Sequence, residues 1–176
     1  DSWEKLAGCD TRNYVLKRDM TNVVTRSEKD CTVLSGVLND PYTAKQLQFM
    51  RGPETSDDVQ IDHVVALSDA WQKGAQSLSF ERRVQFANDM LNLLAVDGQA
   101  NQGKSSSDAA SWLPPNKSYR CMYVARQVAV KKKYELWVTD AEKAAIKRVL
   151  NDCPDQQLPL VIEVKNVQEA TTQSQN

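Results

Sequence analysis

The sequence predicts an α+β fold, with a small antiparallel sheet inside a mainly helical domain. Three observations support this class. Short apolar runs between turn signals predict strands, two helical segments joined by a short loop follow Tyr119, and four cysteines suit two disulfides. The 176 residues suit one domain with a core of its own. We place this domain at residues 1–155 and expect a polar, partly disordered tail at 156–176.

The first part of the chain is expected to form a helix and a hairpin, followed by a further strand. The helix is predicted over residues 11–19, and the run Cys-Thr-Val-Leu-Ser-Gly-Val-Leu at 31–38 is typical of a strand. The turn signal Asn-Asp-Pro at 39–41 follows, and residues 44–49 return as the partner strand. The apolar and β-branched residues at 60–67 predict the next short strand.

The middle of the chain is expected to continue with two helices, a strand and a short polar helix. The helices are predicted at residues 67–73, ending near Gly74, and at residues 80–90. The apolar run at 91–96 predicts a strand, and the Asp-Gly turn after it leads into a polar stretch that ends near Asp108. A further edge strand is expected at 158–164.

The two helices after Tyr119 also predict the disulfides. They span about residues 119–134 and the segment after Thr139, where Thr139 and Glu142 have the spacing of a capping box. Helices joined by a short loop run antiparallel, so the start of the first helix and the end of the second lie together. We therefore predict the pairs Cys121–Cys153 and Cys9–Cys31, against the alternative of four buried free thiols.

Composition and cysteine usage narrow the cellular setting. Disulfides indicate an oxidising, extracellular environment. The chain opens Asp1-Ser2-Trp3 without the basic and apolar regions of a signal peptide, which fits a cytosolic protein or a secreted one whose signal peptide has been removed. Together these features favour secretion. No apolar run approaches the ~18 residues of a membrane span, so we expect no membrane association. No obligate protein partner is evident.

The formal net charge of −1 is not typical of a nucleic-acid-binding protein. Basic residues nevertheless cluster locally, as at positions 131–133. Such clusters are mostly solvated faces, and they would form a phosphate-binding surface only where several of them converge.

The single histidine, His63, directly follows Asp62 on a predicted strand. Neighbouring side chains on a strand point to opposite faces, so the two residues can serve different tasks. Taken alone, the pair is also compatible with a structural histidine that happens to follow an acid. A serine hydrolase based on His63 is disfavoured because the chain has no G-x-S-x-G motif.

Two asparagines nine residues apart, Asn92 and Asn101, add to this pair. A polar helix packed on the strands can bring Asn101 opposite the end of the Asp62 strand. A carboxylate and an amide oxygen are hard ligands that suit Mg²⁺ or Mn²⁺, and His63 could then take a proton from an attacking water. Lys104, one turn beyond Asn101, could reach the phosphate that this water attacks, or it could be a solvent-exposed lysine. The Asn92 side chain can tie down the loop that holds His63.

These residues resemble the HNH (ββα-metal) nuclease motif, and the segment Asn101-Gln102-Gly103-Lys104 is similar to the HNH domain of CRISPR effector nucleases. The wider chain resembles the bacterial HNH family found at the C-terminus of GmrSD-type restriction enzymes and in secreted proteins. This resemblance runs from about Cys9 to Cys153. The matching blocks are residues 9–13, 59–71, 86–89 through 96–98, and 112–115.

The resemblance implies a ββα-metal core and an endonuclease that hydrolyses DNA with Mg²⁺ or Mn²⁺. Asp62 and Asn101 would be the metal ligands and His63 the general base. Asn92 would orient the His63 loop, and Lys104 would assist at the phosphate. The chain departs from the commoner motif at Asn101, where many HNH enzymes have histidine. Two oxygen ligands make a sparse site, which favours magnesium or manganese over zinc.

Four further expectations concern single residues. Arg12 could contact the phosphate backbone or form an internal salt bridge. Asp108 could add a metal ligand, although capping of a following helix is favoured. Trp71 and Trp112 are expected in the core rather than as base-stacking platforms.

A 20 kDa chain without a separate domain for reading the DNA sequence is expected to have little sequence preference. The alternative to an enzyme is a non-catalytic nucleic-acid-binding module on the same scaffold.

Overall fold

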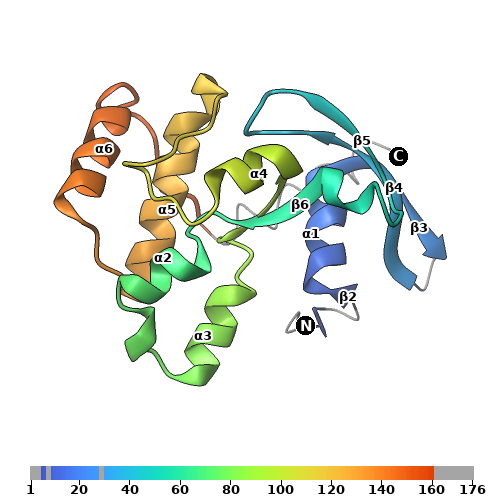
Figure 1. The fold of residues 1–176 in the computed structure, drawn as a ribbon, viewed down its shortest axis with the longest axis horizontal. Coiled ribbons are helices and arrows are strands. Elements are labelled where there is room, and N and C mark those ends of the chain that lie inside the picture. Colours follow the sequence, from blue (N-terminus) through green and yellow to red (C-terminus); the bar gives the residue numbers. More distant parts are fainter. Residues whose placement is uncertain (1–4, 7–8, 28–29, 161–176) are drawn as a thin grey trace.

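The computed structural model describes residues 5–6, 9–27 and 30–160, and Figure 1 shows how these segments are arranged. Within them, the strands form three antiparallel sheets. The strands are β1 (Lys5–Leu6), β2 (Cys9–Asp10), β3 (Met20–Ser27), β4 (Asp30–Asn39), β5 (Gln46–Met50), β6 (Val59–His63) and β7 (Leu93–Asp97). Strands β1 and β2 pair, β3, β4 and β5 form the second sheet in that order, and β6 pairs with β7.

Six α-helices and three short 3₁₀ helices complete the described part of the chain. The α-helices are α1 (Thr11–Asp19), α2 (Leu67–Gln72), α3 (Phe80–Ala87), α4 (Gly98–Lys104), α5 (Arg120–Tyr134) and α6 (Asp140–Asn151). The 3₁₀ helices are η1 (Ser56–Asp58), η2 (Ala75–Ser77) and η3 (Lys117–Tyr119). The α+β class is confirmed, although three small sheets stand where one was expected.

Strand β3 was not predicted from the sequence. It pairs with β4 through an irregular register that shifts between Thr21 and Val24 and again before Ser27. Most of its side chains are exposed, and Val24 remains 53% exposed. An edge strand with so few buried positions lacks the regular alternation of apolar and polar residues by which strands are recognised.

The N-terminal core lies between α1, the β3–β4–β5 sheet and the β6–β7 pair. Asp10 caps α1 by accepting a hydrogen bond from the backbone N–H of Asn13 at 2.7 Å. The buried face of α1 carries Val15 and Leu16, which belong to one apolar cluster with residues of β4, β5, β6 and β7. The Cys9–Cys31 disulfide joins β2 to β4 with a Cα–Cα distance of 5.2 Å, as predicted.

At the opposite end, α5 and α6 form the predicted antiparallel hairpin (Figure 1). The hydroxyl of Thr139 accepts a hydrogen bond from the N–H of Glu142 at 3.1 Å, which caps α6. The second predicted disulfide, Cys121–Cys153, closes the hairpin with a Cα–Cα distance of 6.3 Å. Of the edge strand expected at 158–164, residues 158–160 are not in a strand. Its remainder and the expected disordered end lie outside the described residues.

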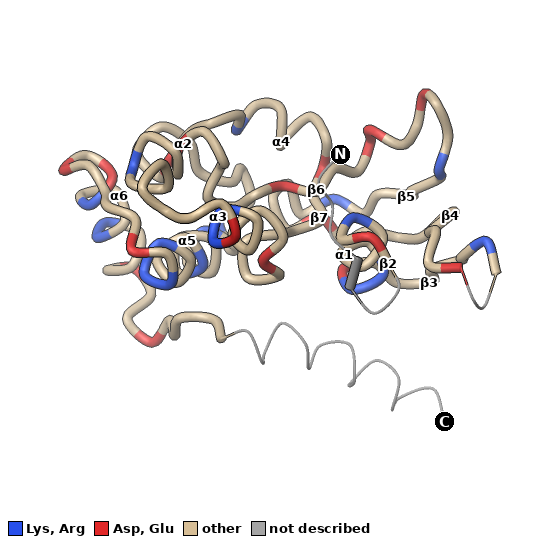
Figure 2. The backbone as a smooth tube through the Cα atoms, turned by 90° about the horizontal axis from the view of Figure 1, so that it is seen from below, with Lys and Arg blue, Asp and Glu red and all other residues tan. Residues whose placement is uncertain are grey.

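A buried ionic network connects α2 to this hairpin. Lys73, directly after α2, pairs with Asp69, Asp108 and Glu142 at 2.6–2.7 Å, and Lys131 of α5 pairs with Asp69 and Glu142. Figure 2 shows that residues of both charges occur in this half of the molecule. Because the pairs are almost fully buried, removal of one partner would leave an uncompensated charge in the interior.

Candidate active site

The β6–β7–α4 unit positions the residues of interest. Val59 faces Asp97 and His63 faces Leu93 across the two strands, and α4 starts directly after β7. Asp97 caps α4 by accepting from the N–H of Ala100 at 2.7 Å. The chain between β6 and β7 forms α2, η2 and α3, so the order is strand, helical excursion, strand, helix.

His63 is held by the end of α3. Its Nε2 lies 2.8 Å from the carbonyl oxygen of Ala87, the last residue of that helix. A carbonyl oxygen only accepts hydrogen bonds, so Nε2 must carry the proton and donate it. In a neutral imidazole the lone pair that can take a proton is therefore on Nδ1.

The surroundings keep this imidazole neutral. The pKa of His63 lies below its ordinary value. The main cause is the partial burial of the ring, and the charge of Lys104 acts in the same direction. The Ala87 carbonyl and the carboxylate of Asp62 oppose this shift without cancelling it. A neutral ring at neutral pH is the state that a general base requires.

Asp62 lies on β6 beside His63, but its side chain contacts other partners. The hydroxyl of Tyr42 donates to Oδ2, and the ammonium of Lys104 lies 2.9 Å from Oδ1. The residue is only 4% exposed, and this burial raises the pKa of its carboxyl although Lys104 and Tyr42 favour the charged form. The different partners of Asp62 and His63 follow from the alternation of side chains along a strand.

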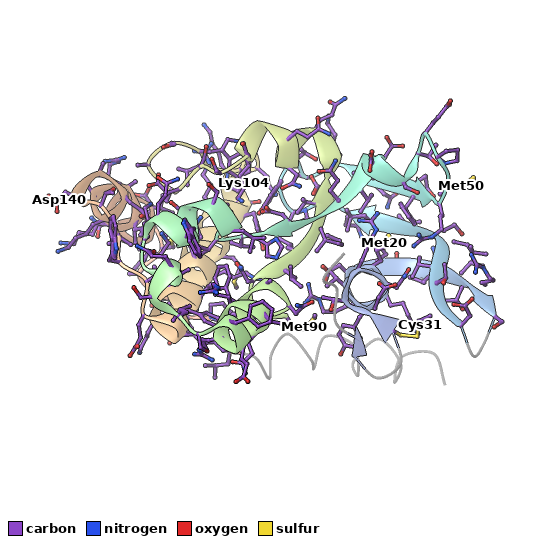
Figure 3. The ribbon with its side chains drawn as sticks, turned by 60° about the horizontal axis from the view of Figure 1, so that its bottom comes forward. Met20, Cys31, Met50, Met90, Lys104 and Asp140 are labelled. Carbon is purple, nitrogen blue, oxygen red and sulfur yellow. A yellow bond between two sulfur atoms is a disulfide. The ribbon has the colours of Figure 1, made fainter. Side chains whose placement is uncertain are left out.

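Lys104, the last residue of α4, is fully buried (Figure 3). Its Nζ donates to Oδ1 of Asp62 and to the backbone carbonyl of His63, both at 2.9 Å. The reading of Lys104 as a solvent-exposed lysine is therefore wrong. Its ammonium contacts the Asp62-His63 segment and compensates the negative charge of the buried Asp62 carboxylate.

Asn92 holds the backbone that follows His63. The side chain is fully buried, with Oδ1 accepting from the N–H of Val65 at 2.8 Å and Nδ2 donating to the carbonyl of Val65 at 3.2 Å. The backbone carbonyl of Asn92 also accepts from the N–H of Val64 at 2.8 Å. Three hydrogen bonds thus fix the two residues after His63 to the start of β7. The catalytic role of Asn92 stays a prediction.

Asn101 faces β6 from α4. Its Nδ2 donates to Oε1 of Gln60 at 2.8 Å. Gln60 and Asp62 share one face of β6, and Asn101 and Lys104 share one face of α4. The strand and the helix therefore meet through two neighbouring contacts, Asn101 with Gln60 and Lys104 with Asp62.

This geometry can be compared with a metal-ligand set. Within the described ranges, no three His, Cys, Asp or Glu side chains lie together in an arrangement that could hold a metal ion. Asp62 and Asn101 would supply one carboxylate and one amide oxygen. Asn101 uses its nitrogen toward Gln60, and its oxygen is the atom suited to a cation. Lys104 already occupies Oδ1 of Asp62, so a cation and the ammonium would compete for this carboxylate.

Arg12 and Asp108 have internal contacts. The guanidinium of Arg12 donates to the carbonyls of Ser56 and Val59 at 3.1 and 3.2 Å and so attaches α1 to the start of β6. Burial is the main cause that lowers its pKa. Asp108 accepts from the N–H groups of Ala110 and Ser111 within a turn and pairs with Lys73. The next described helix, η3, is capped by Asn116, so the expectation that Asp108 caps the following helix is wrong.

The two tryptophans differ from each other. Trp112 is half-buried and packs edge-on against the rings of Tyr42 and Tyr123, with centroids 5.1 and 5.6 Å apart. Trp71 is 52% exposed, so the expectation that it lies in the core is wrong. The buried residues of α2 are Asp69 and Ala70, which places Trp71 on its outer side.

Two partners in the site could not be foreseen. Tyr42 precedes Asp62 by twenty residues, on the turn after β4, and only the fold brings its hydroxyl to the carboxylate. The Asn-Asp-Pro turn signal predicts a reversal there but no partner. Ala87 contributes its backbone carbonyl, a group that every residue carries, so its side-chain identity gives no signal.

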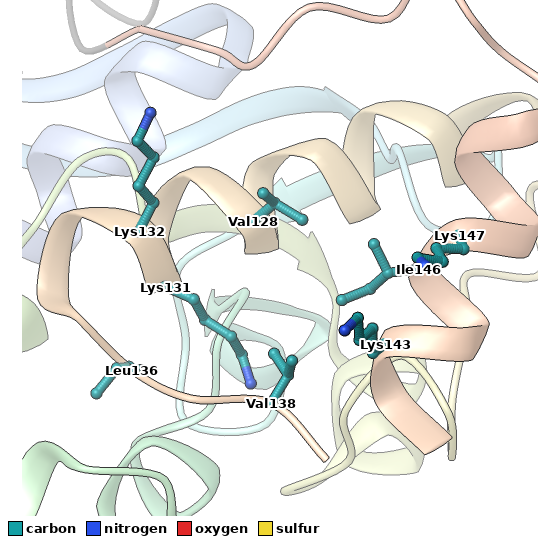
Figure 4. Close-up of a pocket in the computed structure, with 8 residues that line it drawn as sticks. All are labelled: Val128, Lys131, Lys132, Leu136, Val138, Lys143, Ile146 and Lys147. Carbon is teal, nitrogen blue, oxygen red and sulfur yellow. The ribbon is translucent and has the colours of Figure 1, made fainter. Parts of the chain in front are cut away.

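A pocket of about 410 Å³ lies between α5 and α6, apart from all of these residues (Figure 4). Its lining combines aliphatic side chains with Lys131, Lys132, Lys143 and Lys147. Lys131 is already paired with buried acids. The pocket contains none of the predicted site residues.

Strands β6 and β7 form an antiparallel pair followed by α4, with Asp62-His63 at the end of the first strand, and the ββα-metal identity of this unit stays a prediction. The family model of the C-terminal domain of GmrSD restriction endonucleases matches residues 10–149, and the chain belongs to this family. The family suggests a nuclease-related role.

A protein of Arthroderma benhamiae is similar to this chain over most of its length. It is 42% identical over 154 residues, which cover 86% of this chain and 72% of the relative. That protein is named an uncharacterized secreted protein. The bacterial origin that the resemblance implied stays a prediction.

Among the described residues, no helix combines the length and the apolar character that a bilayer crossing requires.

Proposed function

We propose that this protein is an HNH-type endonuclease that hydrolyses DNA phosphodiester bonds with His63 as the general base. The observation that carries the proposal is the contact between His63 Nε2 and the Ala87 carbonyl, which makes Nδ1 the proton acceptor. The membership of the GmrSD C-terminal family supports a nuclease-related role.

In the proposed reaction, Nδ1 of His63 takes a proton from water as the water oxygen bonds to phosphorus. The bond between phosphorus and the leaving oxygen breaks, and the leaving group departs with the electron pair. The imidazolium formed in this step is stabilised by the Ala87 carbonyl and by the charge of Asp62, because both raise the pKa of His63. Asn92 fixes the backbone after His63 and thereby limits movement of the base.

Asp62 and Asn101 would hold one Mg²⁺ or Mn²⁺ ion in this proposal. Their hard oxygen donors fit such an ion, and the small donor number is compatible with ions that retain several waters. When bound, the ion would neutralise negative charge on the scissile phosphate and the leaving oxygen. Lys104 would move from Asp62 toward the phosphate, because the carboxylate would then be neutralised without it.

We further propose that the protein acts outside the cell and with little sequence preference. The two disulfides support an oxidising compartment, and a 42% identical relative carries the name of a secreted protein. Phosphate contacts without base-specific readout would make DNA binding strongly dependent on salt.

One observation favours a second candidate function, a nucleic-acid-binding module without catalysis. The ammonium of Lys104 already compensates the Asp62 carboxylate, so the segment is electrostatically satisfied without a metal ion. Such a protein would bind DNA and leave it intact with every divalent cation.

The test is nicking of supercoiled plasmid with Mg²⁺ or Mn²⁺, with and without a chelator. We expect cleavage that the chelator abolishes and that falls roughly 10²–10⁴-fold in His63→Ala, the usual contribution of a general base. Lys147→Ala, a change at an exposed lysine of α6, is the matched control and should cleave as the unmodified protein does. Full activity of His63→Ala would refute the mechanism, and DNA binding without nicking would favour the module.

A further inference from the structure

Helix α2 presents an apolar face to solvent. Leu67 and Trp71 are one helical turn apart on the same side, and they are 48% and 52% exposed. Adjoining apolar side chains that remain exposed can mark an interaction site, and an aromatic side chain gains more stabilisation from burial than most others.

A guanidinium is fixed over this indole. The Cζ atom of Arg83 lies 5.6 Å from the centroid of the Trp71 ring, within the range of a cation–π contact. Arg83 is held in this place because its Nη1 donates to the carbonyl of Leu78 at 2.7 Å. The surface therefore combines a large π system with a positive charge whose position is set by the α3 segment.

The surface is connected to the candidate base through α3. Arg83 and Ala87 occupy the same face of α3, four residues apart, and the carbonyl of Ala87 holds the imidazole of His63. Helix α2 itself begins four residues after His63. Helix α3 thus carries Arg83 and also supports the general base of the proposed reaction, while α2, which carries Trp71, follows that base along the chain.

We propose that Trp71 and Arg83 form a stacking site for an unpaired nucleobase of the DNA strand. The indole would stack on the flat face of the base, and the guanidinium would pair with the adjoining phosphate. An apolar π surface next to a fixed cation matches a nucleotide, which joins a base to an anion. This inference rests on the proposed function in taking DNA as the substrate and adds how one nucleotide of it is held.

The experiment measures binding of a fluorescent single-stranded oligodeoxynucleotide in the presence of a chelator, so that affinity is determined without turnover. We expect Trp71→Ala to weaken binding roughly 5- to 150-fold and Trp71→Phe to retain most of the affinity, because a stacking surface remains. Trp137→Ala is the matched control. Trp137 is 53% exposed and lies on the α5–α6 connection, and its removal should leave the affinity unchanged.

An oligonucleotide with abasic sites separates stacking from a general effect on the protein. The unmodified protein should bind it more weakly than the normal strand, and Trp71→Ala should cause no further loss. Affinity of Trp71→Ala equal to that of the unmodified protein, or an equal loss with normal and abasic strands, would overturn the proposal. So would an unmodified protein that binds no oligonucleotide.

The outcome also separates this proposal from the endonuclease. A protein that binds through Trp71 but leaves plasmid intact would keep the stacking site and refute the endonuclease. A protein that nicks plasmid through His63 and binds normally as Trp71→Ala would keep the endonuclease and refute the stacking site.

Discussion

The Nε2 atom of His63 lies 2.8 Å from the carbonyl oxygen of Ala87, twenty-four residues further along the chain. This contact turns the end of α3 into the element that selects the tautomer of the imidazole. The selection needs no particular side chain at position 87. It depends instead on α3 ending where its last carbonyl can reach β6, and on Asn92 and Lys104 holding the backbone around His63.

The first prediction concerns pH. Burial lowers the pKa of His63 below its ordinary value of about 6.5, so the neutral base persists at neutral pH and somewhat below it. The nicking rate should therefore stay level down to about pH 6.5 and fall about tenfold per unit once the pH is below the pKa. Initial rates across a pH series at constant ionic strength test this, and a midpoint above about 6.5 would contradict it.

The second prediction concerns Asn92. Its replacement in Asn92→Ala leaves the N–H and carbonyl of Val65 without their buried partner, at a cost of about 1–3 kcal/mol for each group left unsatisfied. We expect a lower free energy of unfolding in urea and slower nicking, because the backbone after His63 loses its restraint. Asn92→Asp retains the acceptor but sets a buried carboxylate against the Val65 carbonyl, so it should destabilise the protein at least as much as alanine does. Stability and rate equal to those of the unmodified protein would exclude this role.

The third prediction concerns Lys104. Lys104→Met removes one partner of a buried ion pair and should lower the free energy of unfolding by about 3–5 kcal/mol. The double variant Asp62→Asn/Lys104→Met removes both charges and should recover part of this loss. Lys147→Met replaces an exposed lysine and should change stability by less than about 0.5 kcal/mol. Equal melting curves for Lys104→Met and Lys147→Met would show that the buried pair contributes nothing.

The fourth prediction compares two glycines of α4. A Cβ at Gly98 would lie 2.0 Å from the carbonyl oxygen of Asp57, whereas a Cβ at Gly103 would meet nothing within 4 Å. Gly98→Ala should therefore force α4 away from η1 and destabilise the protein by several kcal/mol. Gly103→Ala should stabilise it by up to about 1 kcal/mol, because alanine favours the helix interior. Calorimetry on the two variants checks the contrast, which would fail if Gly98→Ala melted like the unmodified protein.

The sequence alone predicted the elements whose signals are local. Helix α1 matches the predicted residues 11–19, and the cysteine pairs followed from the helical hairpin. Strand β3 was missed because its exposed, irregular residues carry little periodicity. Trp71 was expected in the core because its neighbours are apolar, but α2 turns Asp69 and Ala70 inward instead.

The candidate site was less accessible to sequence reasoning than the elements that carry it. The Asp62-His63 pair and the asparagine spacing are visible as local patterns. The contacts of Asp62 with Tyr42 and of His63 with Ala87 depend on how distant segments fold together. The contact between Lys104 and Asp62 depends on the angle between α4 and β6, and the spacing of residues along the chain does not specify that angle.

The connectivity of the disulfides has a consequence for how the chain acquires its structure. Each bridge joins cysteines that are consecutive along the sequence, with separations of 22 and 32 residues. Neither loop encloses β6, β7 or α4, so the cross-links constrain the two flanks, and the central unit is held by non-covalent packing against them. A chain that emerges from its N-terminus can therefore close the first bridge before the third cysteine appears. Native pairing then requires no exchange through a mispaired intermediate.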